Sequence, residues 1–112
     1  MVKGNQKSQE MAKGTAIEIA RQFISFLRKN KYDIQQAYLF GSYAKGKFDR
    51  DSDIDLAIVM SNIPDSFLMQ MELMKVSWRF DSRIEPHPFD VTDFNSGDPF
   101  AREILKTGIR VT

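Results

Sequence analysis

The sequence predicts an α+β fold, in which a small mixed β-sheet is backed by helices. Apolar residues recur at helical spacing in some segments and form short extended runs in others, and the two kinds of segment are interleaved along the chain. The expected order is helix, strand, strand, helix, strand, helix. With 112 residues, the chain is long enough for one domain, 1–112, and too short for two.

Three helices are expected. The first spans residues 15–30, with Thr15 as its N-cap and Glu18 completing a capping box, while residues 1–13 fray or extend it. The second opens at Pro64-Asp65. The third has Asp98 as its N-cap and Pro99 at its first helical position, and it runs through Lys106. One face of the second helix is apolar and carries Phe67, Met71, Met74 and Trp78.

The strands are expected at 35–40, 53–60 and 83–89, with a last short one at 109–111. Residues 43–52, between the first two, are polar and should form a short helical turn and a loop. Pro86 and Pro88 either place the third strand at an edge of the sheet or end it early, because proline cannot donate a ladder hydrogen bond.

Composition narrows the class of protein. With 16 Lys and Arg against 15 Asp and Glu, the net charge is +1, which does not indicate nucleic-acid binding. The lack of cysteine rules out disulfides and thiolate metal sites. The polar N-terminus is unlike a signal peptide, and no stretch approaches the roughly 18 apolar residues of a membrane span. We therefore expect a cytoplasmic protein without membrane association.

The stretch around the first two strands carries the chemistry. Asp53 and Asp55 are one residue apart, so both side chains point to one face of an extended chain. Two like charges this close favour a cation between them, and Mg²⁺ prefers carboxylate and phosphate oxygens. Gly41-Ser42 offers a bend, a backbone N–H and a hydroxyl to a triphosphate oxygen. Together these features predict a site for phosphoryl or nucleotidyl transfer.

Simpler interpretations exist for the same residues. The acidic residues Asp49, Asp51, Asp53 and Asp55 form an acidic run that could be a calcium loop. However, Ile54 stands where an EF-hand needs glycine. The Asp53 and Asp55 pair could be a solvated strand face, and Ser42 an ordinary turn residue. His87, the single histidine, is either a functional base or ligand or an exposed side chain.

The motif resembles the signature of the DNA-polymerase-β-like nucleotidyltransferases, which is Gly-Ser, ten residues, then Asp-x-Asp. Gly41-Ser42, residues 43–52 and Asp53-Ile54-Asp55 match it without a gap. The resemblance covers residues 34–90 and implies the nucleotidyltransferase version of the predicted fold. The short chain looks like the minimal nucleotidyltransferases, which are often paired with a HEPN-type helical protein as toxin and antitoxin.

The family implies a third acidic residue on a neighbouring strand. Glu85 is our choice, because it lies in the middle of the third expected strand. Asp90 and Asp81, at the edges of that strand, are the alternatives. Family members often carry Asp at this place, and the longer Glu side chain could shift a metal ion. His87 lies two residues from Glu85, on the same strand face.

The resemblance implies transfer of AMP from ATP to an acceptor hydroxyl by two-metal catalysis. Asp53, Asp55 and Glu85 would hold two Mg²⁺ ions, one for the acceptor hydroxyl and one for the triphosphate. Gly41-Ser42 would hold phosphate oxygens. Lys45 fits an added phosphate contact as well as it fits a solvated loop lysine.

For the acceptor, the resemblance indicates a tyrosine of a HEPN-type partner protein, with this chain as the antitoxin. The apolar face from Phe67 to Trp78 would either pack in the core or dock that partner. Two other functions stay open: a silent antitoxin that occludes its partner, and transfer onto a small molecule. The sequence also leaves homo-oligomers and the choice of base open.

Overall fold

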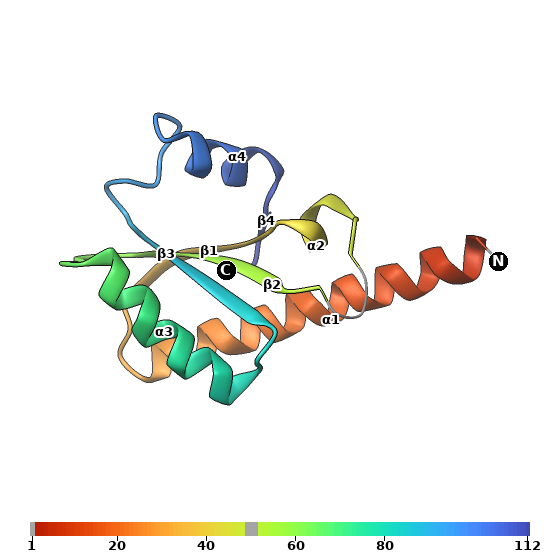
Figure 1. The fold of residues 1–112 in the computed structure, drawn as a ribbon, viewed down its shortest axis with the longest axis horizontal. Helices are drawn as coiled ribbons and strands as arrows, with labels where there is room; N and C mark the ends of the chain where they lie inside the picture. Colours follow the sequence, from red (N-terminus) through yellow and green to blue (C-terminus); the bar gives the residue numbers. More distant parts are fainter. Residues whose placement is uncertain (1, 49–51) are drawn as a thin grey trace.

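A four-stranded sheet separates the helices into two layers (Figure 1). Helices α1 (Val2–Lys29) and α3 (Ser66–Phe80) cover one face, and α4 (Pro99–Thr107) lies over the other. The computed structural model describes residues 2–48 and 52–112, with side chains from residue 12 onward. The sheet and its helices confirm the predicted α+β class.

The strand order is β3-β2-β1-β4, with bounds Ile84–Asp90, Ile54–Met60, Ile34–Phe40 and Ile109–Arg110. β1 runs antiparallel to β2 and to β4, whereas β3 runs parallel to β2. β3 is therefore an edge strand, which is one of the two possibilities that its prolines predicted. The chain crosses over through α3 between β2 and β3. Because the two strands run parallel, Asp55 of β2 lies beside Glu85 of β3.

Alternation along β2 decides which side chains are buried beneath α1 and α3. Ile54, Leu56 and Ile58 are fully buried in the main core. Helix α1 adds Ala16, Ala20, Phe23, Ile24 and Leu27 to that core. On the opposite face, Tyr38 and Ala57 form a smaller cluster with Ile104 of α4. Asp55 belongs to this second face, because it alternates with Ile54 and Leu56.

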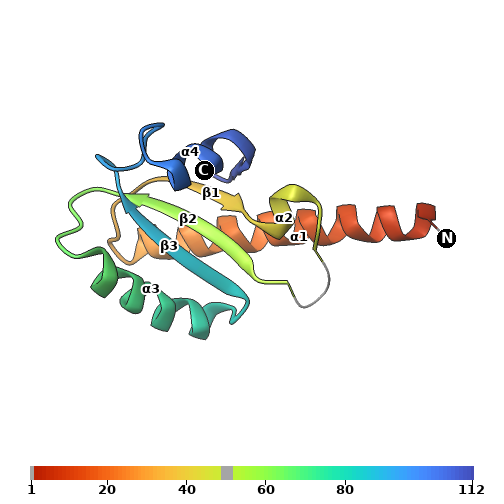
Figure 2. The same cartoon turned by 45° about the horizontal axis from the view of Figure 1, so that its top comes forward.

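Of the two possibilities for the N-terminal segment, the structure shows the extension of the first helix. Helix α1 starts at Val2, so Thr15 lies inside it and is not an N-cap. Residues 2–14 contain three Lys, two Gln and one each of Glu, Met and Ala, and these good helix formers carry the helix past Thr15 despite Gly4 and Gly14. The extended part projects beyond the sheet (Figure 2). Although α1 has 28 residues, no helix in the described part of the chain is long and apolar enough to cross a membrane.

The starts of α3 and α4 match the sequence. The Asp65 carboxylate accepts a hydrogen bond from the backbone N–H of Leu68 at 3.0 Å. Asp98 accepts one from the N–H of Phe100 at 2.9 Å, with proline at the start of the helix. The predicted turn after β1 is the short helix α2 (Ser42–Lys45). Residues 49–51 of the predicted loop, including two aspartates of the acidic run, lie outside the described residues.

The apolar stripe of α3 faces outward. Phe67, Met71 and Trp78 are 69%, 45% and 60% exposed, whereas Leu73 and Ser77 of the same helix are buried. The helix thus turns a different set of residues toward the sheet. For these three side chains the core interpretation was wrong, and the docking interpretation remains.

We expect Leu73→Ala to lower the free energy of unfolding by about 2–5 kcal/mol, because it empties part of the core between α3 and the sheet. Met71→Ala on the exposed stripe is the matched control and should change it by less than about 0.5 kcal/mol. Urea unfolding followed by circular dichroism measures both values. Similar losses in the two variants would mean that α3 is rotated differently.

Candidate active site

Three adjacent strands bring the motif together at one place on the sheet. Phe40, the last residue of β1, pairs with Asp55 of β2, and Asp55 pairs with Glu85 of β3. Gly41 follows Phe40 directly. Segments far apart in the sequence therefore meet on the face of the sheet that α1 and α3 leave uncovered.

The turn after β1 requires glycine. Gly41 has φ 74° and ψ −145°, a conformation that costs residues with a Cβ considerable strain. A Cβ on this residue would lie 3.2 Å from Cγ of Asp55 and would overlap its carboxylate oxygen. The bend of the Gly-Ser pair and the carboxylate of the Asp-x-Asp strand are therefore in direct contact.

Helix α2 begins with Ser42, the second residue of the Gly-Ser pair. Tyr43 is buried and stacks on Phe48 with ring centroids 4.4 Å apart, which anchors the turn to the body of the domain. Ser42 is partly buried at the start of the helix. Lys45 is exposed, and no ion pair joins it to an acid among the residues that the structure describes.

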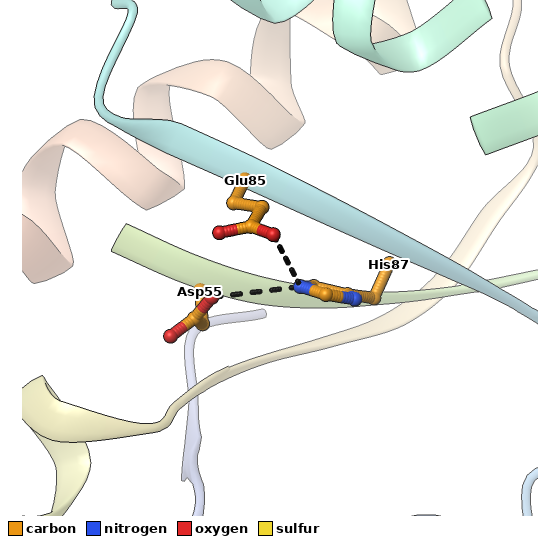
Figure 3. A group of neighbouring side chains, drawn as sticks. All are labelled: Asp55, Glu85 and His87. Atoms are coloured by element: carbon orange, nitrogen blue, oxygen red, sulfur yellow. Dashed lines mark ion pairs between the residues drawn. The ribbon is translucent and has the colours of Figure 1, made fainter. Parts of the chain in front are cut away.

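Asp55, Glu85 and His87 converge on one point (Figure 3). His87 Nε2 lies 3.5 Å from Oδ1 of Asp55 and 3.9 Å from Oε1 of Glu85. The side chains of Asp55 and His87 are 24% and 22% exposed, and that of Glu85 is 45% exposed. The group is thus a half-buried set of oxygen and nitrogen ligand atoms that opens to solvent.

Asp53 lies at the rim of this group. It is exposed and comes one residue before β2, which begins at Ile54 rather than at residue 53. Burial raises the pKa of Glu85, the negative charges of Asp55 and Asp53 raise it further, and His87 opposes them. A hydrogen bond between Asp53 and Glu85 adds to the shift. The part of this shift that comes from Asp55 and Asp53 is repulsion between like charges, which a cation between them would relieve.

Asp81 is occupied elsewhere. Its carboxylate accepts hydrogen bonds from the backbone N–H and the guanidinium of Arg83, with Nη2 at 3.0 Å from Oδ2. The hydrogen bond from that guanidinium holds the pKa of Asp81 below its ordinary value. Asp81 therefore fixes the turn before β3.

Asp90 lies at the opposite end of β3. It pairs with Met60, five residues and about 16 Å of strand away from Glu85. Its carboxylate accepts hydrogen bonds from the hydroxyl and N–H of Thr92 and from the N–H of Ile63, and these lower its pKa. Of the three acids that the sequence offered, Glu85 is the one that the structure brings to Asp55.

An aromatic group that the sequence did not reveal borders the acids. The ring of Phe40 lies edge-on to His87, with centroids 5.1 Å apart, and edge-on to Phe100 of α4 at 5.5 Å. Phe89 contacts Phe100 at 5.5 Å in the same manner. Phe40 next to the motif and the alternation of Glu85, His87 and Phe89 were the available signals, but the contribution of α4 depends on the fold.

The polymerase β, nucleotidyltransferase family matches residues 21–112. The chain belongs to this family. Over 102 residues it is 33% identical to a Methanocaldococcus jannaschii protein that is provisionally named a protein adenylyltransferase. This match covers 85% of this chain and 97% of that protein. Over 62 residues it is 36% identical to the protein adenylyltransferase MntA of Shewanella oneidensis, or 55% of this chain and 45% of MntA.

Two solved structures show the same architecture. A Sulfolobus solfataricus protein, provisionally named a nucleotidyltransferase, superposes with a TM-score of 0.67 over 92% of this chain and 85% of that one, at 19% identity. A toxin–antitoxin structure with AMP-PNP has a TM-score of 0.61 at 28% identity, over 83% of this chain and 72% of that one. The first supports the fold alone. Membership of the family confirms the predicted reaction class, nucleotidyl transfer.

We expect Gly41→Ala to destabilise the protein by about 1–3 kcal/mol through backbone strain. It should also weaken binding of a divalent cation roughly tenfold or more, because the new methyl group displaces the Asp55 carboxylate. Gly46→Ala is the matched control, since Gly46 also has positive φ but has no atom near its missing Cβ. Calorimetric titration should show nearly unchanged cation binding for Gly46→Ala. If the two variants bound the cation equally well, Gly41 would not be part of the site.

Glu85→Gln and Asp90→Asn should have opposite effects. Without added metal, Glu85→Gln should unfold at the same or a higher temperature, because it removes one charge from a group of repelling carboxylates. It should bind divalent cations roughly tenfold more weakly or worse. Asp90→Asn should unfold at a lower temperature, because it weakens the hydrogen bonds to Ile63 and Thr92, and should bind cations normally. Thermal unfolding in EDTA and with cation would show the reverse pattern if Asp90 were the ligand.

Proposed function

We propose that this chain transfers AMP from ATP to a hydroxyl group of a partner protein. The observation that carries the proposal is the contact between the Gly41 backbone and the Asp55 carboxylate, with Glu85 and Asp53 beside it. Two relatives are named protein adenylyltransferases, one of them provisionally, and a related toxin–antitoxin structure contains AMP-PNP. These names support AMP as the group transferred and a protein as the acceptor.

The acidic group fits divalent cations. Burial and the negative charges of Asp55 and Asp53 raise the pKa of Glu85, and the buried Nε2 of His87 has no hydrogen-bond partner among the residues that the structure describes. Asp53, Asp55 and Glu85 would hold the cations, as the family resemblance implies, and Mg²⁺ suits their oxygens. A bound cation supplies positive charge that neutralises phosphate oxygens and eases deprotonation of a hydroxyl.

The chain's own residues orient the reactants. Gly41-Ser42 leaves the backbone open to a phosphate oxygen, and the Ser42 hydroxyl adds a hydrogen bond. The acceptor oxygen forms a bond to the α-phosphorus, while the bond from that phosphorus to the bridging oxygen breaks. Pyrophosphate leaves with the electron pair, and the hydroxyl proton passes to solvent. The side chain of Lys45 is exposed, and it would contact a phosphate group only when a nucleotide is bound.

A partner protein must complete the acceptor side of the site. The acids lie on a partly exposed sheet surface, near the edge strand β3, rather than deep inside the domain. The outer face of α3 next to this edge exposes Phe67, Met71 and Trp78. A HEPN-type helical partner that docks there would reach the acids around β3 and present a tyrosine. Interfaces of this kind bury about 1,200–2,000 Å² in total.

Transfer should depend on Asp53 and Asp55. In a complex co-expressed with a candidate helical partner, ATP and Mg²⁺ should raise the partner's intact mass in steps of one nucleoside monophosphate. Asp53→Asn and Asp55→Asn should each slow this roughly 100-fold or more, because each removes a carboxylate that offsets phosphate charge through the cation. Asp93→Asn, an exposed aspartate after β3, is the control and should transfer normally.

The same experiment separates the other functions. A tight complex of unmodified partner and chain, with no change in mass, would support an antitoxin that acts by occlusion. Transfer to a small molecule without any complex would contradict the protein acceptor and leave the nucleotidyltransferase. Near-normal transfer by either aspartate variant at saturating Mg²⁺ would reject the cation assignment.

A further inference from the structure

One polar atom in the site has no hydrogen-bond partner among residues 2–48 and 52–112. It is Nε2 of His87, which is buried. Its distances to Asp55 and Glu85, 3.5 and 3.9 Å, are both longer than a hydrogen bond. A buried nitrogen without a partner costs free energy, so its place between two carboxylates needs a reason.

The fold holds the imidazole ring in this orientation. Phe40 contacts the ring edge-on, with centroids 5.1 Å apart, and Phe100 does so at 6.2 Å. The residue opposite His87 on β2 is Ala57, whose small side chain leaves room for the ring to lean across the strand toward Asp55. In Figure 3 the Nε2 edge of the ring points between the two carboxylates. The packing therefore aims this nitrogen at the acids.

The spacing of the three groups matches a coordination sphere. At metal–ligand bonds of about 2.1 Å, neighbouring ligands of an octahedral ion lie about 3.0 Å apart and opposite ligands about 4.2 Å apart. The two distances from Nε2, 3.5 and 3.9 Å, lie between these two values, so small side-chain movements would bring the atoms onto one ion. One ligand atom from each of Asp55, Glu85 and His87 lies within 4.8 Å of the others. A divalent cation would satisfy the nitrogen and both carboxylates at once.

We propose that His87 Nε2 is a metal ligand, which makes the cation position beside Glu85 a mixed oxygen and nitrogen site that prefers Mn²⁺ to Mg²⁺. Mg²⁺ favours oxygen ligands and keeps much of its water. Imidazole is a ligand of first-row transition-metal ions, and of these Mn²⁺ is the one that carboxylate ligands also suit. The proposal deepens the proposed function by naming the ion. It rests on that function only for the cation's role in transfer, because binding can be measured without a partner or ATP.

The first test reads the ligand directly. Electron spin echo envelope modulation of Mn²⁺ bound to the wild-type chain should show coupling to a directly bound ¹⁴N nucleus. His87→Phe, which keeps an aromatic ring against Phe40 and Phe100, should abolish that coupling. Manganese bound by the wild-type chain without nitrogen coupling would overturn the proposal, whatever the variants do.

The second test measures selectivity by competition of Mg²⁺ against Mn²⁺. The wild-type chain should bind Mn²⁺ at least roughly tenfold more tightly than Mg²⁺, and His87→Phe should lose most of this preference. His87→Gln offers an amide oxygen in place of nitrogen, so it should bind both ions and shift the preference toward Mg²⁺. An unchanged Mn²⁺ to Mg²⁺ ratio in both variants would contradict the assignment.

Folding and function are controlled separately. Thermal unfolding in EDTA shows whether each variant is folded, and the wild-type spectrum requires no variant at all. If nitrogen-bound Mn²⁺ is found but no partner protein gains mass with ATP, the ligand assignment stands and the proposed function fails. If partner transfer occurs with oxygen-bound Mn²⁺ alone, the function stands and His87 is not a ligand.

Discussion

The contact between the Gly41 backbone and the Asp55 carboxylate is the constraint on which the site depends. It joins the end of β1 to β2 at a distance that admits no side chain on residue 41. The positive φ of Gly41 sends the chain into α2 at once, and buried Tyr43 fixes that turn. The bend that we propose binds nucleotide and the strand that we propose binds the cation are thus positioned by one contact.

The sheet supplies the rest of the geometry. Because β3 runs parallel to β2 in register, Glu85 falls beside Asp55 without any adjustment of the chain. The buried face beneath, filled by Ile54 and Leu56, holds the acids on the opposite face by simple alternation. This core offsets the cost of holding the carboxylates close together. Burial of Glu85 and the negative charges of Asp55 and Asp53 raise the pKa of Glu85.

The sequence predicted those features of the fold that depend on interactions between residues close together in the chain. The caps at Asp65 and Asp98 and the edge position of β3 follow from short-range rules of hydrogen bonding. The choice of Glu85 rested on the family resemblance and on its place in the middle of the expected strand, and its position beside Asp55 depends on the parallel pairing of β2 and β3. The start of α1 did not follow from a capping rule, because good helix formers outweigh a capping signal at Thr15. The exposure of the α3 stripe could not be predicted either, since several faces of that helix are apolar and packing selects among them. Alternation placed His87 on the same strand face as Glu85, but the orientation of its ring depends on Phe40 and Phe100 from separate elements, so only the fold reveals that orientation.

Labelled ATP tests the central claim most directly. The chain, a helical partner and a divalent cation would be incubated in parallel with ATP radiolabelled at the α-phosphorus and with ATP radiolabelled at the γ-phosphorus. Nucleotidyl transfer predicts that the α label becomes covalently attached to the acceptor and that the γ label leaves in pyrophosphate, with both outcomes lost in Asp55→Asn. Attachment of the γ label instead would show phosphoryl transfer and would contradict the account.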